Sequence, residues 1–270
     1  MHAAARYLRL FAAFARFGLT RELAFRGNFL IKVTVEFLWL GILIIFYRTV
    51  FTKTSVVADW TEAEYLFFVG CYFTLEGLME TFFLSNCSEF ANLVRSGDLD
   101  FYLLKPIDEQ FLVTCRDLDW STVPNVLMGM SVAGVALAQL PWQFDLGRAV
   151  LFVVLFASGV VIAYSFLLML TSSSVWLMRN QSLFEMWWLF TSLMRYPREI
   201  FVGRWASPLG WFFTFVIPIL LVVNVPARGL AKQVFDPWLV TFTLVTAVVL
   251  LLVSRWVFRA ALRSYRSASS

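Results

Sequence analysis

The sequence has few of the side chains from which catalytic sites are built. Its 270 residues contain a single histidine, His2, so histidine-based acid–base chemistry and histidine metal sites are effectively excluded. Of the four lysines, only Lys53 precedes serine or threonine, and it lacks the glycines of a phosphate-binding loop. The chain has no recognisable means of using ATP itself. We therefore expect no enzymatic activity and no cofactor in this chain.

Cysteine and net charge are also scarce. The three cysteines, Cys71, Cys87 and Cys115, lack the spacing of metal or redox motifs, so we interpret them as packing residues. A formal net charge of +4 is too small to indicate a nucleic-acid partner. No signal peptide is evident, because five arginines are spread through the first 26 residues without a compact apolar segment.

Apolar residues, by contrast, make up 60% of the chain, and the mean hydropathy of +0.75 is far above that of a globular domain. Four apolar runs approach or exceed the roughly 18 residues with which a helix crosses a bilayer. We expect an all-α, polytopic membrane protein in which residues 1–270 form one transmembrane domain. The runs are Phe29–Phe46, Tyr65–Leu84, Val150–Leu170 and Trp238–Val253.

The arginines predict how the chain is oriented. They cluster before the first run and after the last, so both termini are expected to be cytoplasmic, which requires an even number of crossings. We predict about six spans. The third has charged first turns, at Arg116, Asp117 and Asp119, which should be wet or covered by protein. The spans are Asn28–Val50, Tyr65–Leu84, Phe111–Leu140, Arg148–Leu177, 182–200 and Trp238–Phe258, and Arg179–Asn180 marks the cytoplasmic side.

Two interpretations remain open for the region between the fourth and last spans, where a charged break with Pro197 separates two apolar pieces. We favour a fifth span at 182–200, with 201–226 re-entering the membrane from outside. Irregular backbone at that depth then requires protein or water around it. The alternative places the fifth span at 208–225 and leaves 182–196 on the inner surface.

Residues 3–26 are expected to form a helix that lies on the membrane rather than crossing it. Its arginines share one arc and its aromatic residues occupy the opposite side, which is typical of an interfacial helix beside anionic lipid. The alternative is a cytosolic helix docked on protein. The arginines are Arg6, Arg9 and Arg16, and the opposite side holds Tyr7, Leu10, Phe11 and Phe14.

Residues 86–106 form the most informative polar stretch, which we expect to be a cytoplasmic helix–turn–helix. Asn86 is expected to cap the first helix, with Glu89 reaching back to it. Gly97 suits the left-handed residue that ends this helix, and Pro106 stops the second one. An amphipathic hairpin of this kind is suited to docking a soluble protein, although a loop lying on lipid would show a similar pattern.

The segment Leu93–Pro106 reads LVRSGDLDFYLLKP. It resembles the (R)-x-G-x-L-D-x-x-L-L-x-P segment of ABC type-2 permeases, the membrane subunits of bacterial ABC exporters, and in particular the branch whose permease is encoded apart from its ATPase. The resemblance implies a dimer of permeases, of this chain or with a paralogue, in the inner (plasma) membrane. Two ATPase subunits, which hold the ATP and Mg²⁺, would bind beneath it. Residues 86–106 would be the coupling helix and 201–226 the re-entrant outer gate.

We expect a few residues of this element to dominate the ATPase interface, with Leu99 and Leu104 as apolar anchors. Arg95, Asp98 and Asp100 are expected to fix the register through charge complementarity. The full expected set is Arg95, Gly97, Asp98, Leu99, Asp100, Leu104, Lys105 and Pro106.

Glu76 and Glu80 lie four residues apart in the second span, and hence on one helix face. A charge within a span costs at least about 2.5 kcal/mol, so it usually faces protein or a water-filled path. The two carboxylates are expected either to line a path for cationic or amphipathic cargo or, as we favour, to be structural. In the structural interpretation they pair with Arg95 or Arg116, or they lie at a wet cytoplasmic end of the helix. Lys32 and Glu36 are expected to form a local ion pair.

Two other functions remain open. An ion-gradient-driven secondary transporter would show inverted repeats and broken helices in both halves of the chain, and only the second half shows such breaks. A membrane-embedded enzyme would require the carboxylates of Glu76, Glu80, Asp117 and Asp119 to converge, perhaps around a metal. We prefer the exporter permease, whose cargo the sequence does not identify.

Overall fold

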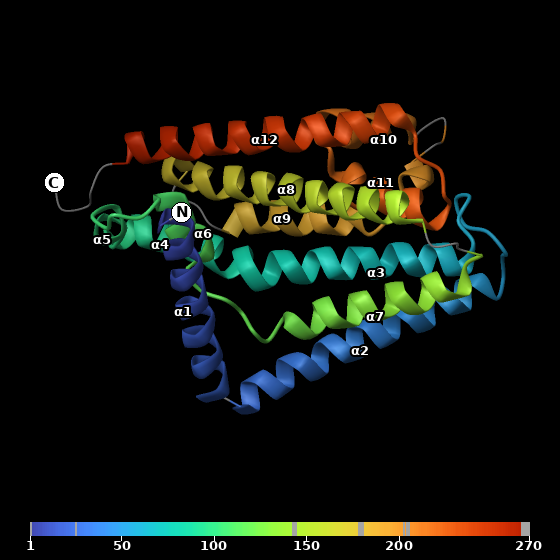
Figure 1. The fold of residues 1–270 in the computed structure, drawn as a ribbon, viewed down its shortest axis with the longest axis horizontal. Coiled ribbons are helices and arrows are strands. Elements are labelled where there is room, and N and C mark those ends of the chain that lie inside the picture. The colour runs from blue at the N-terminus through green and yellow to red at the C-terminus, as the bar shows by residue number, and fades with distance from the viewer. Residues whose placement is uncertain are drawn as a thin grey trace.

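The computed structural model describes residues 2–24, 26–141, 145–177, 181–201, 203 and 206–265. The predicted cytoplasmic marker Arg179–Asn180 lies outside these residues. Long helices run side by side, and α1 (His2–Ala24) lies across one end of them (Figure 1). The same end holds α4 (Ser85–Ser96), α5 (Leu99–Leu103), α6 (Glu109–Cys115) and the last turns of α12 (Pro237–Ser264), and we call it the α4–α6 end. The other helices are α2 (Arg26–Phe51), α3 (Glu62–Met79), α7 (Val123–Gln139), α8 (Leu146–Leu177), α9 (Gln181–Met194), α10 (Ser207–Trp211) and α11 (Ile219–Ala231).

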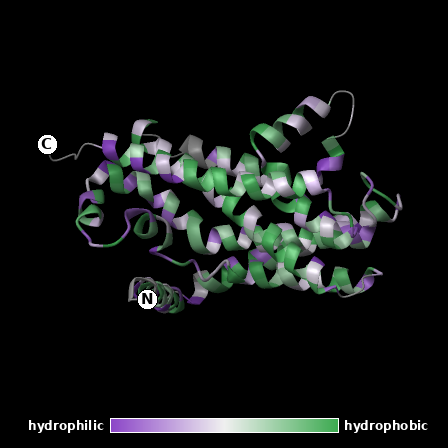
Figure 2. Ribbon diagram, turned by 45° about the horizontal axis from the view of Figure 1, so that its top comes forward, coloured by the Kyte–Doolittle hydropathy of each residue, from purple (hydrophilic) through white to green (hydrophobic). Residues whose placement is uncertain are grey.

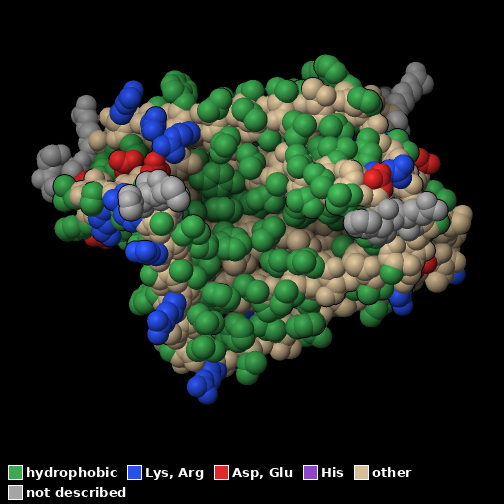
Figure 3. Space-filling model, in the orientation of Figure 1, with side chains coloured by type: hydrophobic (Ala, Val, Ile, Leu, Met, Phe, Trp, Pro, Cys, Tyr) green, Lys and Arg blue, Asp and Glu red, His purple; other side chains and the backbone are tan. Residues whose placement is uncertain are grey.

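In the part of the chain that the structure describes, four helical segments are long and apolar enough to cross a membrane, and they correspond to the predicted first, second, fourth and sixth spans. No strand occurs among the described residues, so the all-α membrane fold is confirmed. Polar residues lie mainly toward the two ends of the bundle (Figure 2). The surface between those ends is mostly hydrophobic on the face drawn in Figure 3. The segments are Phe29–Phe51, Glu62–Ser96, Leu146–Leu177 and Pro237–Ser264.

Local sequence explains where these helices begin. Thr61 and Glu64 form a capping box at the start of α3, with the Thr61 amide donating to the Glu64 carboxylate over 2.8 Å. The Asp236 carboxylate accepts from the Trp238 amide at the start of α12. Proline occupies the first turn of α7, where its missing amide proton costs nothing.

The predicted cap at Asn86 is wrong. The second span continues from α3 through a π-helical turn at Glu80–Leu84 into α4 without a break. The Asn86 side chain is buried in mid-helix, where it donates to the carbonyl of Asp117 over 2.7 Å and accepts from the Asp117 amide over 2.9 Å. This paired contact fixes the chain after α6 against the second span and takes the place of a cap.

The predicted third span, Phe111–Leu140, is two helices rather than one. The charged residues interrupt the chain between α6 and α7, and α7 has only 17 residues. Small residues bring α7 close to α3, because a Cβ on Gly70 would overlap the backbone of Ala133, and one on Gly129 that of Thr74. The charged turns were expected to be wet or covered by protein, and α1 covers them. The indole of Trp120, which follows these turns, donates to the carbonyl of Ala15 in α1 over 2.8 Å.

The region after α9 enters and leaves the bundle at the end opposite α4–α6. A 3-10 turn at Arg198–Phe201 follows α9, and the helices Ser207–Val216 and Ile219–Ala231 then meet at an angle of 90°. Glu199 and Lys232 both contact the loop between α2 and α3, so they lie at the same end. This is the geometry expected of a re-entrant segment, and its place in a membrane stays a prediction. The boundary at 226 is wrong, because α11 accommodates Pro226 and continues to Ala231.

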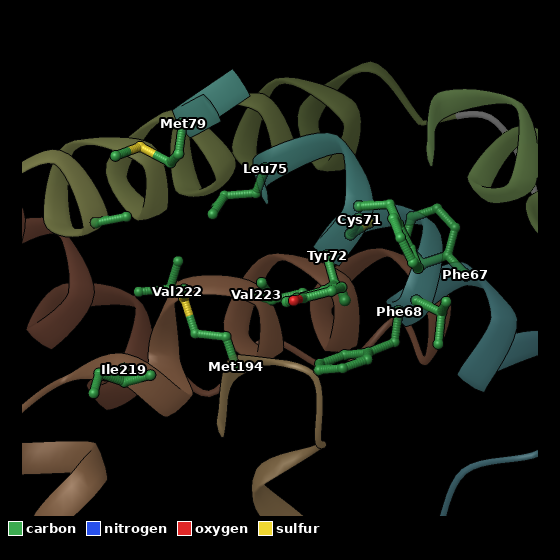
Figure 4. Packing of buried hydrophobic residues seen from close by; sticks show 14 of the residues in the cluster. Phe67, Phe68, Cys71, Tyr72, Leu75, Met79, Met194, Ile219, Val222 and Val223 are labelled. Carbon is green, nitrogen blue, oxygen red and sulfur yellow. The ribbon is translucent and has the colours of Figure 1, made fainter. Parts of the chain in front are cut away.

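The main core is formed where α3, α9 and α11 meet. Tyr72 and Phe68 of α3 point toward Val223 of α11, with Met194 of α9 beside them (Figure 4). Within the described residues, the first span joins this core through the half that leads to the α2–α3 loop, where Leu40 and Tyr47 are buried. Most of the remaining α2 surface is exposed, as a helix facing lipid would be.

The aromatic side of α1 faces protein rather than lipid. Tyr7 and Phe14 pack on the ring of Phe111, and Phe11 stacks on Phe82. The prediction that these aromatic residues face lipid is therefore wrong. That side of the helix is docked on protein, as the alternative interpretation predicted. A second apolar side, with Leu8 and Leu23, is exposed, and the position of residues 3–26 on a membrane stays a prediction.

Candidate coupling element and intramembrane carboxylates

Gly97 separates the two helices of the expected coupling element. Its φ of 79° is left-handed, as predicted, and a residue with a Cβ would be strained there. The Ser96 hydroxyl donates to the Asp98 carboxylate over 2.7 Å and thereby ties the two sides of the turn together. The turn directs α5 away from α4 at one fixed angle.

Leu99 is not exposed, and its predicted part as an ATPase anchor is wrong. Its side chain is 0% exposed, in a cluster that includes Phe90 of α4 and Val113 of α6. Leu168 of α8 and Phe258 of α12 complete that cluster. Leu99 therefore fixes the element to two long helices, because burying an aliphatic side chain stabilises the contact by about 1.5–3 kcal/mol.

Leu104 is 81% exposed at the tip of the element, as an anchor would be. Phe101 is 66% exposed and was not among the predicted anchors. The two lie three residues apart and share one helix side, which is a signal that the sequence carries. Charged or rigid residues surround the pair: Arg95, Asp98, Lys105 and Pro106 are exposed, and Asp100 is half-buried.

Three contacts tie the far side of the element to other helices. Arg255 of α12 donates to the carboxylate of Asp108 over 2.7 Å, Arg6 donates to the carbonyl of Pro106 over 3.1 Å, and the Tyr7 hydroxyl accepts from the Asp108 amide. Partial burial alone would raise the pKa of Asp108, but its hydrogen bonds with Arg255 and the Phe111 amide outweigh burial and lower it. Asp108 therefore stays ionised and holds α6 against α1 and α12.

The pairing of the span carboxylates with Arg95 or Arg116 is wrong. Arg116 donates to the Tyr102 hydroxyl and its guanidinium lies 5.0 Å from the centre of that ring. Arg95 is exposed on α4. The positive group that attracts Glu76 is instead Arg195, just after α9.

The predicted pair of Lys32 with Glu36 is also wrong. The Lys32 ammonium lies 3.6 Å from the Asp119 carboxylate and donates to the Ser121 hydroxyl over 3.1 Å. Glu80 accepts a hydrogen bond from the Asn125 amide over 3.3 Å. Lys32 is thus engaged away from Glu36, while Glu76 has Arg195 as its positive neighbour and Glu80 has Asn125 as its hydrogen-bond donor.

The four carboxylates of the alternative enzyme do not converge. Asp117 accepts from Arg21 over 2.6 Å and Asp119 pairs with Lys32, so each of the two is engaged with its own cation. Within the described parts of the chain, no three His, Cys, Asp or Glu side chains are arranged to hold a metal ion.

Residues 37–269 match the sequence profile of a family described as "ABC-2 family transporter protein". A comparison with curated proteins gave no match. The profile covers all of the chain after the first part of α2, including the coupling element and the bent helices near the C-terminus. The chain therefore belongs to the ABC-2 transporter family, whose members are membrane-embedded transport permeases.

Proposed function

We propose that this permease belongs to an ATP-driven exporter in which a separate ATPase binds the α4–α6 end. The observation that carries the proposal is the exposed pair Phe101 and Leu104, set among charges on an element that Gly97 holds at a fixed angle. Apolar anchors inside a charged rim are the usual composition of a protein-binding hot spot. The ATP and Mg²⁺ belong to the ATPase.

The packing of the element supplies a route from the ATPase to the spans. Helix α4 is the direct continuation of the second span, since Glu62–Ser96 is helical throughout. Leu99 is clamped between that helix and the ends of α8 and α12. A displacement of the tip would therefore tilt three long helices together, because close-packed interiors move as units rather than deform.

Two copies of the ATPase would bind a pair of permeases, either two of this chain or this chain and a paralogue. In this arrangement the α4–α6 end faces the cytoplasm of a cell with its exporter in the inner (plasma) membrane, and membrane lipid covers the remaining apolar surface. The first and last helices both reach this same end, since α1 contacts the start of α6 and α12 ends beside α4. The bent segment from Ser207 to Ala231 would close the outer side.

The test is co-purification of the tagged permease with its ATPase, followed by ATP hydrolysis in lipid. The variant Leu104→Asp should lose the ATPase, because a charge replaces the exposed apolar anchor, and Gly97→Val should lose it because α5 is misdirected. Val56→Asp is a matched control, since Val56 is also exposed but lies at the opposite end. Retained ATPase and turnover in both test variants would contradict the proposal.

The secondary-transporter alternative has one discriminating observable. The first half of the described chain contains a π-helical turn, but in it no two helices that are together apolar enough to form a span are bent as the pair at Val216 and Ile219 is. A gradient-driven carrier would move cargo in vesicles without any ATPase. Transport by the purified chain alone would favour that alternative.

A further inference from the structure

An almost wholly apolar groove lies over α3, between α7 and α8, and its volume is about 420 Å³. The α3 residues that line it run from Phe67 to Leu78. Aromatic rings form the wall on the α8 side, since Phe152 lies 5.9 Å from the ring of Phe67 and stacks on Phe156 at 5.9 Å. An apolar cavity of roughly 150 Å³ accommodates benzene, so this groove has room for a much longer apolar group.

Small side chains on α7 keep the groove open. Gly134 lines it, and a Cβ added there would meet no atom within 4 Å. The helix is held on α3 at another position, since a Cβ on Gly129 would overlap the backbone of Thr74. Thr74 also lines the groove, but its hydroxyl donates to the carbonyl of Gly70 over 2.8 Å. Its hydrogen bond is therefore made within α3 rather than with an occupant of the groove.

The groove matches one leaflet of a bilayer in length and in position. Leu78 lies eleven residues after Phe67, which corresponds to about 16 Å at roughly 1.5 Å per residue of helix. The hydrocarbon core of a bilayer is roughly 30 Å thick, so one leaflet is half of that. Phe67 is near the start of α3, in the half of the second span opposite the α4–α6 end. Next to the lining residues, Val135 of α7 and Val153 of α8 are exposed, as lipid-facing side chains are.

A chain of polar contacts lies just beyond the groove, toward the α2–α3 loop. Arg148, one turn before Phe152 in α8, donates to the side-chain oxygen of Gln233. Gln233 in turn donates to the carbonyl of Pro141 over 3.2 Å. Phe152 and Leu230 line the groove, and Gln233 follows Leu230 by three residues. The apolar groove thus ends where polar groups begin, which is the order of chain and head in a lipid.

We propose that this groove holds one acyl chain of a membrane lipid, in the leaflet opposite the α4–α6 end. A chain of methylene groups gains from apolar contact along its whole length and needs no hydrogen bond. A polar ligand would leave its own donors and acceptors unpaired there. Because this membrane protein exposes apolar side chains on both sides of the groove, lipid chains are the molecules that surround its opening. The inference goes beyond the proposed function and does not depend on the ATPase.

The experiment uses phosphatidylglycerol with a photoreactive diazirine in the middle of one acyl chain, added in increasing amounts to nanodiscs that contain the wild-type chain. Adducts mapped by mass spectrometry should saturate at Met130 and Phe156 in the groove, whereas labelling of exposed Val249 on α12 should rise in proportion to the probe. Labelling that rises alike at both places would overturn the proposal. An unlabelled groove beside labelled Val249 would also overturn it, since another occupant, such as a second copy of this chain, would then cover the groove.

Gly134→Trp tests the site by filling the groove without a clash at the new Cβ, and it should remove the saturable labelling. Gly41→Trp is the matched control, because Gly41 also lies in a span and a Cβ there meets no atom within 4 Å. It should keep the labelling. Saturable labelling that persists in folded Gly134→Trp would contradict the proposal. If that variant fails to fold, the saturation measured on the wild-type chain still decides.

A second measurement uses no photochemistry. A ligand that binds only the folded state raises the melting temperature, so phosphatidylglycerol added to the detergent-solubilised chain should stabilise the wild type and Gly41→Trp. The shift should be smaller in Gly134→Trp, whose indole already occupies the groove. Equal shifts in the three proteins would show that lipid stabilises the chain elsewhere and would overturn the assignment of this groove.

Discussion

The guanidinium of Arg255 donates to the carboxylate of Asp108 over 2.7 Å and thereby joins the last long helix to the start of α6. The same guanidinium group donates to the side-chain oxygen of Gln110 over 3.1 Å. Because both contacts lie directly beside the coupling element, they set how firmly that element is held to α12.

Asp108→Asn should loosen this attachment. The pair is partly exposed, so we expect a loss of about 1 kcal/mol in stability rather than unfolding. Since the folded state lowers the pKa of Asp108, its contribution is present above the ordinary carboxyl range and is lost as the pH falls through the lowered value. Hydrogen exchange over α5 and α6 should rise in the variant. Asp145→Asn, in an exposed pair with Arg148, is the control and should leave that region unchanged.

Gly129→Val should destabilise the bundle by about 1–3 kcal/mol or more, because the new side chain would strike the backbone of Thr74 and force α7 off α3. Gly134→Val lies on the same helix, at a position where an added Cβ meets no atom within 4 Å. It should leave thermal unfolding in detergent almost unchanged. Equal melting of the two variants would mean that the close α3–α7 contact does not exist.

Glu199 holds the bent segment to the loop between α2 and α3. Its carboxylate accepts from Trp60 over 3.0 Å, from Asn224 over 2.9 Å and from Arg228 over 2.9 Å. Glu199→Ala leaves all three donors without this acceptor, at a cost of about 1–3 kcal/mol for each buried group. Hydrogen exchange should therefore increase in residues 52–61 and in α11 together. An increase confined to one of the two would show that Glu199 does not link them.

Cysteine labelling in intact cells tests the orientation. With the native cysteines removed, Ala5→Cys and Ser264→Cys should resist an impermeant thiol reagent, since both lie at the end proposed to face the cytoplasm. Thr54→Cys, in the loop at the opposite end, should react readily. Labelling at Ala5 or Ser264 without labelling at Thr54 would reverse the orientation.

Long apolar runs and one glycine were the parts of the structure that the sequence predicted well. A run such as Leu146–Leu177 has no polar face, so a helix through a membrane is the only fold that suits it. Gly97 is readable because few other residues adopt a left-handed backbone. Both signals are local and need no knowledge of the neighbouring helices.

The errors arose where a tertiary contact replaced a local one. Asn86 has a side chain that can cap a helix. In the structure, the backbone of Asp117 instead pairs with both the nitrogen and the oxygen of the Asn86 side-chain amide. Lys32 is spaced along the helix to pair with Glu36, but its ammonium group forms an ion pair with Asp119 instead. Leu99 and Leu104 look alike in sequence, and only the arrangement of α8 and α12 decides that one is buried and the other exposed.

The central claim is that the tip of the coupling element contacts an ATPase. A photo-crosslinking amino acid placed at Leu104 tests it directly in membranes that contain the whole transporter. The account predicts a covalent adduct between Leu104 and an ABC ATPase subunit, and none when the same group replaces exposed Val56 at the opposite end. An equal yield at the two positions, or no adduct at Leu104 while ATP-dependent transport continues, would contradict it.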